Sequence, residues 1–355
     1  MVNWELQEGK YVRDPRLGHR FGINFRGYLE ESNSSINTFQ LSTDEYGFIH
    51  NGENSIRQYP LNKNSNDKII IIGGSLAMGL GASNNESTLA AQLEKLINKD
   101  NNKKIDVINA ACGGYCSWHS VIKLSMELIR LKPIAVIDIS GWNDMLHSSW
   151  GAKNNGEWLE NHDRSIEDVF ISILDAQKKI SFIDRLKYRI KKSKAYLTLK
   201  RFLLITLGKS YSIQDISWGH ENNNLKFRKN GIINFINNLK TLNGICIAHN
   251  IKFIHLLQPN PIWIRNSKRD DTDKVSLDIN LHLHRYKNFS ELSEKYLSSL
   301  KKFYMNNNFN LKFFIDLSDN SDFLLEDWHD HCHLSDKGQL KLANYIFNNY
   351  YDKND

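Results

Sequence analysis

The sequence predicts an α/β protein in which a five-stranded parallel β-sheet lies between two layers of helices. Short apolar runs such as Lys68-Ile69-Ile70-Ile71-Ile72 alternate with longer segments of helical periodicity, which is typical of strands buried on both faces of a parallel sheet. Gly-rich, Asn-rich or Pro-containing turns separate the segments. The expected strands are 68–73, 105–109, 134–139, 251–257 and 312–316, and the expected helices lie near 86–99, 117–131, 228–249, 290–306 and 336–350.

Composition fits one large globular domain. The chain has 355 residues, of which 41% are hydrophobic, and only 5 Pro, so it can fill a sizeable core and has no Pro-rich linker. Its beginning lacks the apolar core of a signal peptide, and no run approaches the roughly 20 apolar residues of a membrane span. We therefore expect a cytoplasmic protein whose 4 cysteines remain reduced.

The first segment, residues 1–66, precedes the first core strand. We expect it to form an N-terminal arm that packs on the sheet edge or borders the functional site, with packing favoured. The main domain then spans 67–355.

The first core strand ends in Gly73-Gly74-Ser75. In open parallel sheets, ligands bind in the crevice beyond the carboxyl ends of the strands, and glycines allow the sharp turn that presents a hydroxyl there. Ser75 is therefore a candidate nucleophile. Most such turns only change the chain direction, so the assignment depends on the segments that follow.

Two later strands end in groups that can bind a negatively charged oxygen. The strand 105–109 runs into Ala110-Ala111-Cys112-Gly113-Gly114-Tyr115, and the strand 134–139 runs into Gly141-Trp142-Asn143-Asp144. Paired glycines allow backbone N–H groups to approach a substrate closely, and Asn143 adds a side-chain amide. Together with the N–H of Ser75, these donors predict an oxyanion hole.

The last part of the pattern is a loop before the C-terminal helix. Asp330 and His333 lie three residues apart in it. At this spacing the carboxylate can orient the imidazole and stabilise the imidazolium, while the imidazole takes the proton of the serine.

In this order the four blocks resemble those of the SGNH hydrolases, also called GDSL-type esterases and lipases. The resemblance covers about 67–145 and 245–350 and implies a three-layer flavodoxin-like sandwich without a cofactor. It implies Ser75 as nucleophile, His333 as general base and acid, and Asp330 as the residue that orients His333. The oxyanion hole would combine the N–H groups of Ser75 and Gly114 with the amide of Asn143.

One residue departs from the family pattern. Gly74 stands at the position of the aspartate in the Gly-Asp-Ser-Leu motif from which the name GDSL is taken. That aspartate is not the acid of the triad, so the triad stays complete and the difference concerns the packing of the turn. Ala111, in place of a common glycine, is a tolerable change.

Residues 145–226 are too many for an ordinary connection and contain helical patterns of their own. Because this segment leaves the sheet directly after Asn143, we expect a mainly helical cap that shapes the substrate pocket. Its stretch 184–209 holds nine Lys or Arg residues against one acid. A solvated surface is the favoured interpretation; an anionic substrate or a peripheral membrane contact is the alternative, whereas no motif indicates nucleic acid. The substrate-binding candidates in it are Lys191, Lys192 and Lys194.

Two further patterns leave alternatives open. His329, His331 and His333 alternate along one segment, and with Cys112 or Cys116 they could bind zinc. We favour no metal, because the serine, glycine and asparagine blocks would then be unexplained. Trp residues lie beside three of the blocks, and they either pack in the core or form an aromatic face for a sugar ring; they are Trp118, Trp142 and Trp328.

The sequence therefore predicts a serine esterase that acts through a covalent acyl-enzyme on an O-acyl ester, with an acetyl group on a carbohydrate as the expected substrate. An O-acyltransferase with the same triad is the first alternative. A non-catalytic protein that binds glycan or lipid is the second, and the complete triad argues against it.

Overall fold

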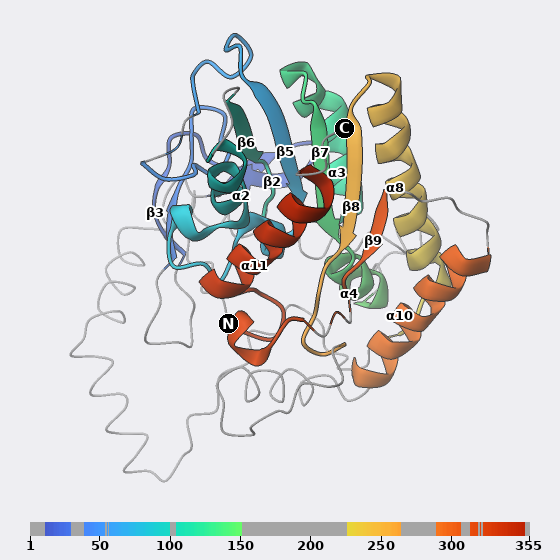
Figure 1. Cartoon of the computed structure of the whole chain (residues 1–355). Helices are drawn as coiled ribbons and strands as arrows, with labels where there is room; N and C mark the ends of the chain where they lie inside the picture. The colour runs from blue at the N-terminus through green and yellow to red at the C-terminus, as the bar shows by residue number, and fades with distance from the viewer. Residues whose placement is uncertain are drawn as a thin grey trace, which may run out of the picture.

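Five parallel strands form the central sheet in the order β6-β5-β7-β8-β9 (Figure 1). The structure is a computed structural model, which describes residues 11–29, 39–53, 55, 57–99, 104–150, 226–263, 289–306, 313–318, 320 and 322–351. The predicted five-stranded parallel sheet is confirmed, and each predicted strand agrees with an observed one within two residues. The observed strands are β5 (Asp67–Gly73), β6 (Ile105–Asn109), β7 (Ala135–Ser140), β8 (Lys252–Leu257) and β9 (Phe314–Asp316).

Helices cover both faces of the sheet, so the three-layer α/β class is also confirmed (Figure 1). Alternate residues of β5 divide between two apolar clusters, Ile69 and Ile71 in one and Ile70 and Ile72 in the other. This division follows from the two-residue period of a strand. One face packs against α2 (Leu89–Asn98) and α11 (Asp336–Ile346), and the other against α3 (Ser117–Met126), α8 (Lys229–Ala248) and α10 (Phe289–Asn306).

The helices differ from the predicted ones mainly at their ends. The segment expected as one helix over 86–99 is a 3₁₀ turn, η1 (Asn85–Ser87), followed by α2. Thr88 separates the two because its hydroxyl accepts the N–H of Ala91 as an N-cap. The C-terminal helix changes to a π-helical turn, η4 (Phe347–Tyr351). In place of a single helix over 117–131, α3 is followed by a 3₁₀ helix, η2 (Leu128–Leu131).

Two helices at the carboxyl edge of the sheet were not predicted. α1 (Ser75–Met78) is a single turn, too short to show a helical period. α4 (Trp142–Trp150) overlaps the start of the segment 145–226, which we expected to be mainly helical, but it begins before that segment. Its buried Trp142, Met145 and Leu146 have the three- and four-residue spacing of a helix face.

The segment before the sheet contains two antiparallel pairs of strands, which were not predicted. The strands β1 (Tyr11–Asp14) and β2 (Gly18–Phe21) form a hairpin, and β3 (Arg26–Leu29) pairs with β4 (Phe39–Ser42). Further along, Ile49 forms an antiparallel bridge with Asn109 of the edge strand β6.

A buried ion pair fixes this segment to the sheet. Arg57 Nη1 lies 3.0 Å from Asp44 Oδ2, and the two side chains are 0% and 2% exposed. The other Arg57 nitrogen, Nη2, donates to the carbonyl of Val107 on β6 over 3.0 Å. Because both charged groups are buried, removing either one would leave the other without a counter-charge.

A second polar group lies inside the sheet itself. Asp138 on β7 is next to His255 on β8, and Asp138 Oδ2 is 2.8 Å from His255 Nδ1. The hydroxyls of Ser120 and Ser140 donate to the two carboxylate oxygens over 2.8 Å and 2.7 Å. Hydrogen bonds therefore compensate this carboxylate for its complete burial.

Most of the predicted cap, from 151 to 225, lies outside the described residues, and so do Lys191, Lys192 and Lys194. Among the residues that are described, no helix is both long enough and apolar enough to cross a membrane.

Candidate active site

Ser75 lies at the carboxyl end of β5, the strand between β6 and β7, where it begins α1. The turn requires a glycine at 73, because its φ is +133° and a Cβ there would lie 2.1 Å from the carbonyl oxygen of Ile139. Ser75 is partly exposed, whereas Leu76 and Ala77 beside it are buried. The fold thus presents the hydroxyl at the edge where the sequence predicts it.

The loop that carries Asp330 and His333 is shaped by the aspartate. Asp330 Oδ1 accepts the backbone N–H groups of Cys332 and His333 over 2.8 Å and 2.7 Å. The N–H of His329 donates to the carbonyl of His333 over 2.9 Å and closes the loop. One carboxylate oxygen therefore folds the turn, which leaves the other for the imidazole.

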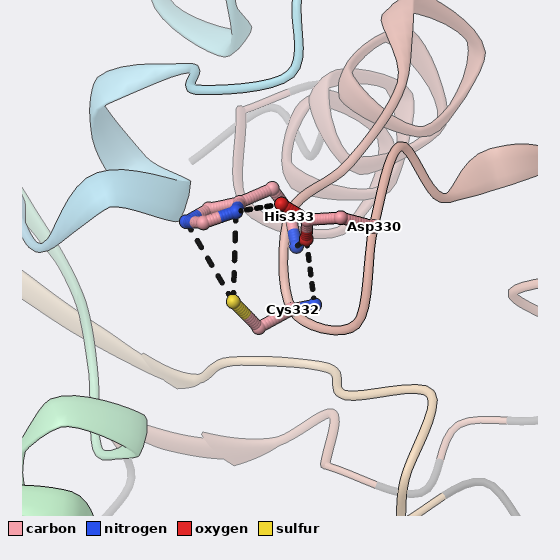
Figure 2. A group of neighbouring side chains, drawn as sticks. All are labelled: Asp330, Cys332 and His333. Atoms are coloured by element: carbon pink, nitrogen blue, oxygen red, sulfur yellow. Dashed lines mark hydrogen bonds and ion pairs between the residues drawn. The ribbon is translucent and has the colours of Figure 1, made fainter. Parts of the chain in front are cut away.

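The structure brings the three predicted triad residues into one hydrogen-bonded line. His333 Nδ1 lies 2.6 Å from Asp330 Oδ2 (Figure 2), and His333 Nε2 lies 2.7 Å from Ser75 Oγ. An ionised carboxylate only accepts hydrogen bonds, so Nδ1 carries the proton and Nε2 is left to accept the serine hydroxyl. This arrangement suits the removal of a proton from Ser75.

The electrostatics support an ionised Asp330. Burial by itself would raise the pKa of this carboxyl group. The charge of His333 and its hydrogen bond act the other way, with help from His331 and the N–H of Cys332, and hold the pKa of Asp330 well below its usual range. Asp330 therefore remains a carboxylate through the physiological pH range.

Polar contacts join the segment that follows Ser75 to the helix that follows His333. The backbone N–H and the hydroxyl of Ser83 each donate over 2.7 Å to a different carboxylate oxygen of Asp336, at the start of α11. The N–H of Leu89 at the start of α2 donates to Gln339 Oε1 over 3.0 Å. Together these contacts hold the two segments, and hence Ser75 and His333, at a defined separation.

Asn143 lies in the first turn of α4, next to the nucleophile turn. Its Nδ2 donates to the carbonyl of Tyr115 over 2.9 Å, and the amide carries a second hydrogen. A Cβ at position 74 would lie 2.6 Å from this Nδ2. The glycine at 74, where the family pattern has an aspartate, thus leaves room for the amide of Asn143.

The loop 110–115, called the glycine loop below, packs against the turn 73–75 that carries Ser75. The N–H of Cys112 donates to the carbonyl of Gly73 over 3.2 Å. Gly113 is buried and Gly114, with φ +79°, is partly exposed. Ser75 and Asn143 are also partly exposed, so all three predicted oxyanion residues are accessible at this edge of the sheet.

Asp144 on α4 is hydrogen-bonded to Ser117 at the start of α3, so it connects these two helices. Its Oδ1 accepts the hydroxyl of Ser117 over 2.6 Å and the backbone N–H of Ser117 over 3.1 Å. Desolvation by burial raises the pKa of Asp144 to about 6, in spite of these hydrogen bonds. The start of α3 is thereby tied to the helix of Asn143.

The histidines and cysteines of the disfavoured zinc alternative are not all close together among the described residues. In the described part of the chain, the one group of three or more His, Cys, Asp or Glu side chains with ligand atoms within 4.8 Å of one another is Asp330, Cys332 and His333, without His329 or His331. Cys332 Sγ lies 3.5 Å from Nδ1 and 3.7 Å from Nε2 of His333, to one side of the ring plane (Figure 2). Nitrogen lone pairs lie in the plane of an imidazole, so the sulfur packs on the ring and does not share a ligand position with it.

The tryptophans predicted as substrate contacts are packed in the interior. Trp142 is 3% exposed and packs edge-on against Trp263 and Phe289. Trp328 is 4% exposed and lies beside Phe323. Core packing, the other interpretation of these rings, accounts for both positions.

Comparisons with known proteins add solved structures only. No family model matches the chain, and no curated protein matches it. Among similar structures, an acetyl xylan esterase, AlAXEase, is 14% identical over 79% of this chain and 98% of its own, with a TM-score of 0.35. A GDSL-like lipase from Bacteroides thetaiotaomicron is 9% identical over 79% and 86%, with a TM-score of 0.39. A lipase from a goat rumen metagenome is 10% identical over 81% and 99%, with a TM-score of 0.41. At these TM-scores the similarity carries no inference about substrate, and the site has to be interpreted from its own geometry.

Proposed function

We propose that this protein is a serine hydrolase of carboxylic esters, with Ser75 as the nucleophile. The observation that carries the proposal is the line of two short hydrogen bonds from Ser75 through His333 to Asp330. A nucleophile, a base and a residue that orients the base, all within hydrogen-bond distance, are the parts that activate a serine.

In the proposed reaction, Ser75 Oγ attacks the carbonyl carbon of the ester while His333 Nε2 takes the hydroxyl proton. The carbonyl electron pair moves onto oxygen, and that oxyanion is bound by the N–H groups of Ser75 and Gly114 and by the amide of Asn143. Collapse of the intermediate breaks the bond to the alcohol, which leaves with the proton from Nε2. Water then repeats the sequence on the acyl-enzyme and restores Ser75.

Within this class, we propose a short acyl group, such as acetyl, on a carbohydrate hydroxyl as the substrate. Trp118 supports a sugar ring here, because it is partly exposed in the first turn of α3, beside the glycine loop. An indole face suits the apolar side of a pyranose.

The proposal is tested with a series of p-nitrophenyl esters of increasing acyl length, assayed with and without added sugar acceptors. A hydrolase releases nitrophenol and free acid at all acceptor concentrations. Transfer of the acyl group to the sugar would instead identify the O-acyltransferase. An organophosphonate provides a second measurement, since the intact mass should increase by one adduct, located at Ser75; an adduct of equal extent on Ser75→Ala would refute the assignment.

A further inference from the structure

A histidine of the N-terminal hairpin contacts the glycine loop of the candidate active site. His19 on β2 is fully buried, and its Nε2 lies 2.9 Å from the carbonyl oxygen of Gly113. In return, the hydroxyl of Tyr115 donates to the backbone carbonyl of His19 over 2.6 Å. The hairpin and the loop are therefore joined on both sides of Gly114 by hydrogen bonds between residues 94 and 96 positions apart.

The protonation state of His19 follows from its partner. A carbonyl oxygen only accepts, so Nε2 must carry a hydrogen. Burial lowers the pKa of His19 to about 3, and the ring is therefore neutral at physiological pH. It is also held by its neighbours, with Tyr11 and Tyr115 in edge-on contact at centroid distances of 5.6 Å and 5.3 Å.

This hydrogen bond fixes a peptide plane that matters for the proposed chemistry. The carbonyl of Gly113 and the N–H of Gly114 belong to the same planar peptide group, in which they point in opposite directions. Neither glycine has a Cβ that would restrict the rotation of this group. A donor that holds the carbonyl toward β2 thus determines the direction of the N–H on the other side.

We propose that His19 is a positioning residue of the oxyanion hole, which fixes the direction of the Gly114 N–H through its bond to the Gly113 carbonyl. The inference rests on the proposed function, because it assigns the Gly114 N–H to the oxyanion. It gives one residue of the N-terminal hairpin, His19, an indirect role in the proposed reaction through the Gly113 carbonyl.

Two substitutions at position 19 separate the donor from the volume of the side chain. His19→Leu fills the space without a donor, whereas His19→Gln places an amide N–H close to the position of Nε2. In His19→Leu the Gly114 N–H is misplaced but still present, so the stabilisation of the oxyanion is reduced and not lost. We expect this variant to lower kcat roughly 10-fold or more, with KM changed less than about 3-fold. His19→Gln should recover most of kcat.

Phe21→Leu is the matched control for hairpin stability. Phe21 is buried in the same strand and stacks on Tyr11 at 4.8 Å, but it has no hydrogen bond to the glycine loop. It should lower the melting temperature about as much as His19→Leu while kcat stays within about 2-fold of wild type.

Equal kcat for wild type and His19→Leu on an ester that the wild type hydrolyses would overturn this inference and leave the proposed function standing. So would a loss in His19→Leu that Phe21→Leu reproduces. If the wild type hydrolyses no ester, the proposed function fails, and crystal structures of the two His19 variants decide the positioning alone. The 113–114 peptide should then be rotated in His19→Leu and unchanged in His19→Gln; an unchanged peptide in both would refute the inference.

Discussion

Among the described residues, one His–Asp pair, His333–Asp330, lies at the carboxyl edge of the sheet, and another, His255–Asp138, lies inside the sheet between β8 and β7. We call them the outer and the inner pair; they differ in which group of the pair is bound by serine. The N···O distances are similar, 2.6 Å for His333–Asp330 and 2.8 Å for His255–Asp138. In the first pair, Ser75 binds the free side of the imidazole. In the second, Ser120 and Ser140 bind the carboxylate.

The order of the groups decides what each cluster can do. A proton can pass from Ser75 to His333 because the hydroxyl and the carboxylate lie on opposite nitrogens of the ring. Within the part of the chain that the structure describes, His255 Nε2 is buried and has no hydrogen-bond partner, and the serines beside it contact Asp138 instead. The same residue types thus form a line suited to proton transfer in one place and a closed hydrogen-bond network in the other.

The largest expected effect is that of Ser75→Ala, which removes the proposed nucleophile and little volume. We expect kcat to fall by roughly 10⁴-fold or more, with an unchanged melting temperature. Stopped assays with a p-nitrophenyl ester measure the loss, and thermal unfolding monitors the fold. Retained turnover would place the nucleophile elsewhere.

His333→Ala should reduce kcat about as strongly, since the serine then has no base. His329→Ala and His331→Ala serve as controls within the same loop and should retain most activity. Inactivation by a chelator, with recovery on adding zinc, would instead assign a metal role to these histidines.

Asn143→Ala removes one proposed oxyanion donor. The expected loss is roughly 10²-fold in kcat with a smaller change in KM, because the donor acts on charge that develops in the transition state. Steady-state kinetics over a range of ester concentrations separates the two constants. A change confined to KM would contradict the oxyanion assignment.

A substitution in the inner pair, His255–Asp138, should lower stability and leave kcat nearly unchanged, whereas one in the outer pair, His333–Asp330, should lower kcat. His255→Gln perturbs a completely buried hydrogen-bond network, and we expect it to lower the free energy of unfolding by about 1–3 kcal/mol, with kcat within about 2-fold of wild type. Denaturant titration measures the stability. A large loss of kcat in a stable variant would bring the inner cluster into the mechanism.

Asp144 extends the comparison to pH. Its pKa is raised from 3.8 to about 6, whereas that of Asp330 is lowered. Between pH 4 and 6 the folded state keeps the Asp144 proton that the unfolded state loses, so this contribution to stability is greatest at low pH and decreases as the pH rises through 6. The stability of wild type relative to Asp144→Asn should fall by about 1.4 kcal/mol per pH unit in that window. A constant difference between the two proteins from pH 4 to 7 would exclude it.

The parts of the molecule that could be predicted are those that depend on residues close together in the sequence. The strands could be predicted because each is a short run made mainly of apolar residues, and the spacing of Asp330 and His333 placed both on one loop. His19 and Gly113 are 94 positions apart, and His255 and Asp138 are 117 apart. Each of these residues is ordinary in its own segment, so nothing local indicates the contact. The one-turn helix at Ser75 is too short to give a periodic signal.

The separation of Ser75 and His333 by 258 residues also has a consequence during protein synthesis. At roughly 5–20 residues per second, the serine is made about 13 to 50 seconds before the histidine. During that interval the nascent chain has the proposed nucleophile without the proposed base. Esterase activity measured in a translation reaction would therefore report that the C-terminal helix has left the ribosome and docked on the sheet.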